Sequence, residues 1–123
     1  MAFAEPQFEL SEEDLDERTH LIAIVGEIHV STAPRFSALL EDAIGRGKTA
    51  VVLDLSAVEF IDSTGLSVLL NGLRRVTRQR GHMALVCTNP TVLRLFEITR
   101  LDATFDIHTD RDSALSAVRA AGG

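Results

Sequence analysis

Two hydrophobic periods alternate along this chain, and together they predict strands that alternate with helices. Three short apolar runs, too short for independent helices, predict buried strands at residues 21–25, 51–55 and 83–87. The mixed apolar and acidic stretch at residues 8–15 predicts an edge strand that runs into a hairpin loop, and we expect its acids only to solvate that edge. Residues 105–108 predict a last short strand.

Between these runs the apolar positions recur at i, i+3, i+4 and i+7, which is the spacing of an amphipathic helix. The four stripes comprise Phe36, Leu39, Leu40, Ala43 and Ile44; then Leu66, Leu69, Leu70, Leu73 and Val76; then Val92, Leu93 and Phe96; and finally Ala114, Leu115, Ala117 and Val118. Capping signals precede three of them: Ser31 and Thr32 with Pro34, Asn89 with Pro90, and Asp110. Glycines follow the first two stripes, at Gly45, Gly47 and Gly81.

This order of elements predicts an α/β fold: a mixed, mostly parallel sheet of about five strands covered by about four helices. A chain of 123 residues is long enough for one domain, which we expect at residues 8–121, with tails at 1–7 and 122–123. Right-handed crossovers place the loops after the second and third strands, residues 26–32 and 56–65, at the same carboxyl edge of the sheet. That edge is where we expect a functional site.

Charge and composition narrow the classes of function. The 12 Lys and Arg against 18 Asp and Glu give a net charge of −6, and no basic stripe follows the chain, so we expect no direct nucleic-acid binding. The arginines at 74, 75, 78 and 80 fit the solvated face and last turn of one helix. A secretory signal and a long apolar span are both missing, so we expect a cytoplasmic protein without membrane contact. The one cysteine, Cys87, fits a buried apolar position.

The segment with the most chemistry lies directly before the second helical stripe. Asp62, Ser63, Thr64 and Gly65 place an acid, two hydroxyls and a glycine at the start of that helix. One interpretation is ordinary capping, in which any of the three polar side chains accepts a first-turn N–H, for about 1 kcal/mol. The other is an exposed Ser63 hydroxyl that accepts a phosphate, which the positive end of the helix would favour.

Catalytic and metal-binding patterns are missing. A nucleophile elbow needs glycine where Ile61 stands, and among the histidines only His29 lies on a loop at the same sheet edge. The chain has neither a Walker A motif nor paired Cys-x-x-Cys or His-x-x-x-His spacing. We therefore expect a binding protein that is no enzyme and needs no cofactor or metal.

Several segments together resemble the anti-sigma factor antagonists of the STAS-domain family. They are residues 25–28, 31–36, 52–55, 60–66, 85–87 and 92–98, and the resemblance extends from Leu10 to Ala120. It implies a mixed-sheet domain with four helices that binds an anti-sigma factor serine kinase and so frees a sigma factor. The kinase would phosphorylate Ser63, and a separate serine phosphatase would reverse this. The implied partner surface comprises Glu27, His29, Ser31, Thr32, Asp62, Ser63, Thr64, Gly65 and Ser67.

One position departs from that family, and two other functions stay open. Many phosphorylated members have an acidic residue where this chain has His29. Loss of that anion beside a site that gains about −1.5 to −2 charges would ease phosphorylation or mark a different partner, and a plain surface role for His29 is the alternative. The same fold also serves as an accessory subunit of a lipid or solute transporter, or as a scaffold in a sensor assembly, and in both Ser63 would only cap the helix.

Overall fold

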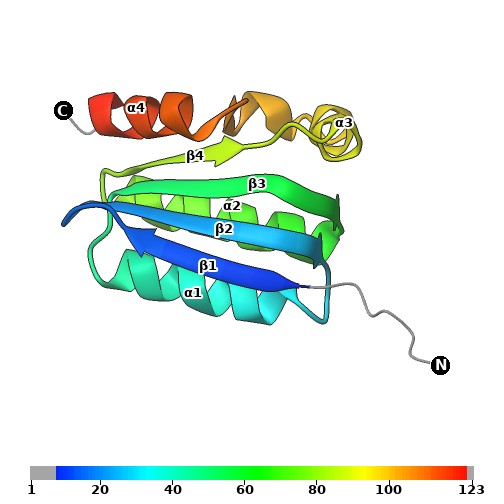
Figure 1. The fold of residues 1–123 in the computed structure, drawn as a ribbon, viewed down its shortest axis with the longest axis horizontal. Helices are drawn as coiled ribbons and strands as arrows, with labels where there is room; N and C mark the ends of the chain where they lie inside the picture. The colour runs from blue at the N-terminus through cyan, green and yellow to red at the C-terminus, as the bar shows by residue number, and fades with distance from the viewer. Residues whose placement is uncertain (1–7, 122–123) are drawn as a thin grey trace.

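A computed structural model of the chain, which describes residues 8–121, contains a mixed sheet with the strand order β1-β2-β3-β4-β5 (Figure 1). The strands are β1 (Glu9–Asp14), β2 (Thr19–Ile28), β3 (Ala50–Ile61), β4 (His82–Val86) and β5 (Asp106–His108). β1 runs antiparallel to β2, and every other neighbouring pair is parallel. The helices of this part of the chain are α1 (Ala33–Gly45), α2 (Ser63–Arg78), α3 (Pro90–Ile98) and α4 (Arg111–Ala121), with a 3₁₀ turn at Leu101–Ala103.

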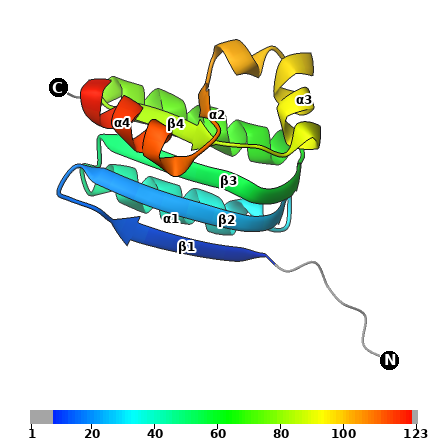
Figure 2. The ribbon, with the colours of Figure 1, turned by 45° about the horizontal axis from the view of Figure 1, so that its top comes forward.

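The helices cover the two faces of the sheet unequally. Alternate residues of a strand point to opposite faces. Val51 and Leu53 of β3 accordingly join the core beneath α1 and α2, whereas Val52 joins the smaller core beneath α4. Figure 2 shows α4 on the opposite side of the sheet from α1 and α2, with α3 at one end. The predicted α/β class, with a mixed and mostly parallel sheet, is confirmed. The tails expected at 1–7 and 122–123 lie outside the described residues.

Two strands continue beyond their predicted ends. β2 passes through Gly26, whose φ of 106° accompanies a bulge, and ends at Ile28. β3 continues to Ile61, although residues 56–65 were expected to form a loop. Its second half pairs only with β2, because β4 ends at Val86, so that half is partly exposed and lacks a continuous apolar run. The prediction of a loop from residue 56 was therefore wrong as far as Ile61.

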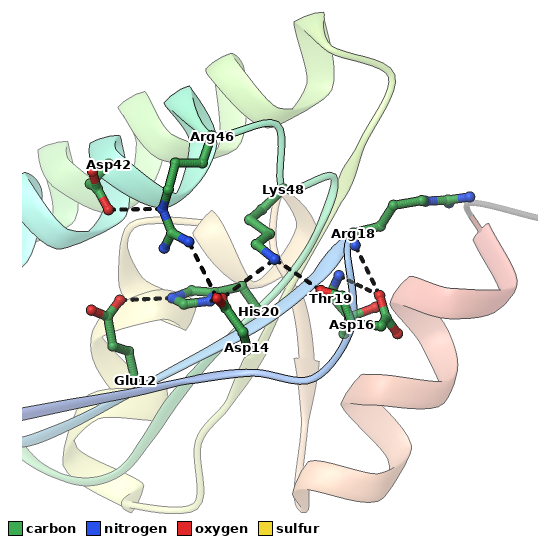
Figure 3. Close-up of polar contacts among 9 residues, drawn as sticks. All are labelled: Glu12, Asp14, Asp16, Arg18, Thr19, His20, Asp42, Arg46 and Lys48. Carbon is green, nitrogen blue, oxygen red and sulfur yellow. Dashed lines mark hydrogen bonds and ion pairs between the residues drawn. The ribbon is translucent and has the colours of Figure 1, made fainter.

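The acids of β1 do more than solvate the sheet edge, so that expectation was also wrong. Figure 3 shows the His20 ring, which is 1% exposed, between Glu12 and Asp14. Its Nε2 lies 2.9 Å from Glu12 Oε2, and its Nδ1 hydrogen-bonds to Asp14 Oδ1. Lys48 Nζ, also next to Asp14, donates to the backbone carbonyl of Asp16 at 2.9 Å. This cluster attaches the edge strand β1 to β2 and to the turn after α1.

None of the helices within residues 8–121 is long and apolar enough to cross a membrane.

Candidate functional site

The junction between β3 and α2 is capped by Asp62. This residue has extended backbone, and its side-chain Oδ1 accepts a hydrogen bond from the backbone N–H of Gly65 at 3.0 Å. Its carbonyl accepts from the N–H of Leu66, also at 3.0 Å. Of the three candidates that the sequence offers for this cap, Asp62 therefore supplies it, and the hydroxyls of Ser63 and Thr64 are not used for it.

Ser63 is the first residue of α2 and is exposed. Its backbone carbonyl accepts a hydrogen bond from the Ser67 hydroxyl at 3.0 Å, one turn further along the helix. Within residues 8–121 its own hydroxyl has no hydrogen-bond partner. The side chain thus presents a free hydroxyl at the positive end of a 16-residue helix, with Ser67 beside it and Thr64 half-buried.

Gly65 is buried beneath this surface and lets α2 approach the sheet. A Cβ atom at this position would lie 2.8 Å from the Cγ2 atoms of both Ile28 and Ile61, and 3.1 Å from the carbonyl oxygen of Ile28. Contacts inside the molecule therefore require glycine here, whether or not a partner approaches. Gly65 shapes the site from below, whereas Ser63 and Ser67 are exposed on it.

The loop between β2 and α1 is held by Thr32 in a way that the sequence did not indicate. Its Oγ1 donates to the carbonyl of Glu27 at 2.7 Å and accepts from the N–H of His29 at 3.0 Å. Although Thr32 occupies the N-cap position of α1, its side chain makes no capping hydrogen bond, and Ser31 does not cap the helix either, so those capping predictions were wrong. His29 Nδ1 accepts from the N–H of Ser31 at 3.2 Å, which fixes the ring against its own turn.

The two loops meet at the carboxyl edge of the parallel strands. Ile28 pairs with Ile61 in the sheet, and the N–H of Asp62 donates to the carbonyl of Ile28 at 3.0 Å. His29 directly follows Ile28 in the chain, and Ser63 directly follows Asp62. Glu27 lies opposite Phe60 in the β2–β3 register and is half-buried. The residues implied for the site therefore come from adjacent strand ends.

An apolar groove beside this edge was missed by the sequence analysis. It has a volume of about 260 Å³ and is lined by Phe60, Ile61, Thr91, Val92, Arg94, Leu95 and Ile98. The sequence held one signal, because Ile98 is a large apolar residue outside the predicted inward stripe of its helix. In the structure this side chain is 69% exposed. Nothing local showed that it would face the end of β3.

The described residues contain no group of three or more His, Cys, Asp or Glu side chains that could hold a metal ion. Cys87 is buried, and burial raises the pKa of its thiol, which disfavours the reactive thiolate. The chemistry that this edge offers is thus an exposed hydroxyl at a helix start beside a structured loop.

Residues 13–114 of the chain match the STAS domain family. The chain belongs to the STAS domain family. The resemblance seen in the sequence is thereby confirmed, and the fold agrees with it.

Relatives of this STAS domain include proteins named as anti-sigma factor antagonists. The chain is 34% identical over 102 residues to the anti-sigma-B factor antagonist of Listeria monocytogenes, across 80% of this chain and 85% of that protein. The crystal structure of an anti-sigma factor antagonist from Mycobacterium paratuberculosis matches with a TM-score of 0.85 and 33% identity, across 94% of this chain and 97% of that one. SpoIIAA of Bacillus in its phosphorylated form matches with a TM-score of 0.69 across 92% and 100% of the two chains; at 24% identity it shows likeness of fold.

Proposed function

We propose that this STAS domain is an anti-sigma factor antagonist, which binds an anti-sigma factor serine kinase, releases its sigma factor and is switched off by phosphorylation of Ser63. The observation that carries the proposal is the free Ser63 hydroxyl at the first residue of α2, next to a cap that Asp62 supplies alone. Because the fold does not use this hydroxyl, phosphorylation would break no internal contact.

The proposed partner surface follows the carboxyl edge of the sheet. It comprises Glu27, His29, Ser31 and Thr32 from the end of β2 and its loop, and Asp62, Ser63, Thr64 and Ser67 from the start of α2, with Gly65 beneath them. The hydrogen bond from the N–H of Asp62 to the carbonyl of Ile28 holds the two parts together, so a partner would contact both at once.

Charge explains how a phosphate would end binding. A phosphoserine carries about −1.5 to −2 charges at neutral pH, and here it would stand next to the carboxylate of Asp62. The N–H groups of the first turn of α2 would stabilise the phosphate within the free domain. A partner would have to desolvate this crowded anion in order to bind, which costs affinity. A serine phosphatase would then restore the binding form.

Relatives support this proposal over the two alternatives. The Listeria protein is named an anti-sigma-B factor antagonist, and one of the similar structures is that of SpoIIAA in its phosphorylated form. A transporter subunit or a sensor scaffold would use Ser63 only as a cap, a role that Asp62 already fills here. We propose that kinase binding and phosphorylation take place in the cytoplasm, and that neither nucleic acid nor membrane is a direct partner of this domain.

The test is incubation of the domain with ATP and each anti-sigma factor kinase domain of the same genome, followed by intact mass and peptide mapping. We expect one of these kinases to add a single phosphate at Ser63. Ser63→Ala should remain unmodified, whereas Thr64→Ala should still gain its single phosphate at Ser63. Failure of every kinase to modify the wild-type domain would contradict the switch, and phosphate on Thr64 would contradict the choice of residue.

A further inference from the structure

The apolar groove is built into the fold between the end of β3 and α3. Asn89 joins its two walls, because its Nδ2 donates to the carbonyl of Val58 at 3.2 Å while its Oδ1 accepts from the N–H of Thr91 at 2.9 Å. On the inner side of α3, the ring of Phe96 packs on that of Phe105 with centroids 5.8 Å apart. The groove is thus held open by contacts that do not involve its exposed side chains.

Its lining combines exposed apolar side chains with one charge that lacks a partner. Phe60 is 46% exposed and Ile98 is 69% exposed, although both are large and apolar. Among residues 8–121, Arg94 makes no ion pair, and the neighbouring acids Glu59 and Glu97 are not part of the lining. An apolar group that carries a carboxylate beside it would complement both features.

The groove is continuous with the proposed switch surface. Phe60 and Ile61, which form one wall, directly precede Asp62 and Ser63 in the chain. A protein seated over Ser63 would therefore extend over the groove with little further reach. This continuity favours a protein partner of the Ser63 site over a free small molecule.

We propose that this groove is an anchor site of the same interface: it binds an apolar side chain of the anti-sigma factor, next to an acidic residue of that factor that pairs with Arg94. The inference rests on the proposed function and adds the chemistry by which the partner is chosen. In many interfaces a few residues seated in well-packed pockets, with arginine among the commonest, carry most of the binding energy. The phosphate at Ser63 would then control an interface whose specificity lies in α3.

The test compares groove variants with a matched control. The partner is the anti-sigma factor kinase domain that binds the wild-type STAS domain, titrated by calorimetry. Ile98→Ser and Arg94→Glu should each weaken binding at least tenfold, whereas Arg94→Lys should keep most of the affinity. Arg119→Glu makes the same charge change on α4, near the β1–β2 turn at the opposite sheet edge, and should change binding less than twofold. Because Ile98, Arg94 and Arg119 are all exposed, thermal melts should show every variant folded.

The possible outcomes distinguish failure of the anchor-site proposal from failure of the proposed function. If the wild type binds the kinase and both Ile98→Ser and Arg94→Glu bind equally well, the anchor site is refuted while the proposed function stands. If no kinase domain of the genome binds the wild type, the proposed function fails and the anchor site with it. If the wild type forms a dimer in sedimentation and Ile98→Ser abolishes it, the groove binds a second copy of the chain and the proposal is overturned. If decanoate binds in the groove and the kinase domain does not compete with it, the groove binds a lipid, which also overturns the proposal.

Discussion

Gly65 is the residue of the site at which added volume would be tolerated least. A Cβ atom there would stand 2.8 Å from methyl groups of Ile28 in β2 and Ile61 in β3, which limit how closely α2 can approach the sheet. We expect Gly65→Val to destabilise the domain by about 1–3 kcal/mol through overpacking, and to weaken partner binding because the start of α2 shifts. The matched control is Gly45→Val, since a Cβ at the end of α1 meets nothing within 4 Å. If urea unfolding gives Gly65→Val and Gly45→Val the same free energy of unfolding, this packing role is refuted.

His29 is expected to tune the switch. Because His29 and Ser63 follow the bonded pair Ile28 and Asp62, a carboxylate at position 29 would place a further anion near the phosphate. We expect His29→Asp to change the phosphorylation rate or the partner affinity by about threefold to thirtyfold, which corresponds to about 0.7–2 kcal/mol. Slower phosphorylation is the direction that like charge predicts. The neutral control is His29→Gln, and identical kinetics for His29→Asp and the wild type would make His29 an ordinary surface residue.

The sequence placed an acid, two hydroxyls and a glycine at the start of α2 but could not decide the role of each residue. Asp62, Ser63 and Thr64 are all good capping residues, so local propensity left the cap open. The choice depends on where β3 ends, and that end is set by the pairing of Ile61 with Ile28, more than thirty residues earlier in the chain. The role of Gly65 is non-local for the same reason, because its contacts include Ile28.

At the scale of elements, the hydrophobic period was enough to distinguish strands from helices. The length of each element and its contacts with the rest of the fold depended on the neighbouring elements. The second half of β3 was expected to be loop, because pairing with β2 alone leaves it too exposed for an apolar run. The groove beside α3 depends on the hydrogen bond between Asn89 and Val58, which no short pattern encodes. The acids of β1 likewise gained a role only through His20 on the neighbouring strand.

The attachment of α4 to the sheet predicts a dependence of stability on acid. Asp54 on β3 is buried, and Arg111 at the start of α4 donates to its Oδ2 at 2.6 Å, while the N–H of Ser56 donates to its Oδ1 at 2.9 Å. Burial alone would raise the pKa of Asp54, but these hydrogen bonds outweigh it and leave the pKa below the usual 3.8. The ionised carboxylate therefore stabilises the fold above about pH 4, and this contribution is lost as pH falls through the lowered pKa.

The variant Asp54→Asn tests this direction of the pH dependence of stability. We expect it to lower the free energy of unfolding at pH 7 by about 1–3 kcal/mol, since a charged hydrogen bond is replaced by weaker ones. The difference from the wild type should shrink as the pH approaches 3. The control is Asp112→Asn, an exposed position on α4 without an ion pair among the described residues, which should follow the wild-type curve. A constant difference between Asp54→Asn and wild type from pH 7 to pH 3 in urea unfolding would contradict the assignment.

At the scale of the whole molecule, the alternation of strands and helices sufficed to predict the α/β class, since strands apolar on both faces need helices on both faces. It also placed two loops at one sheet edge, and the bond between Asp62 and Ile28 joins their bases there. The arrangement separates two requirements: Asp62 and Gly65 hold the fold, and the Ser63 hydroxyl stays free. A charge added at Ser63 should therefore change binding without unfolding the domain.

The most direct test of this separation is calorimetric titration of Ser63→Ala and Ser63→Asp with the anti-sigma factor kinase domain, alongside thermal melts. Ser63→Ala should keep its stability, because Asp62 supplies the cap, and should bind like the unphosphorylated wild type. Ser63→Asp should melt no lower, since an anion at a helix start contributes about 0.3–1 kcal/mol, yet it should bind at least tenfold more weakly. A folded Ser63→Asp protein that binds as tightly as Ser63→Ala would contradict the switch.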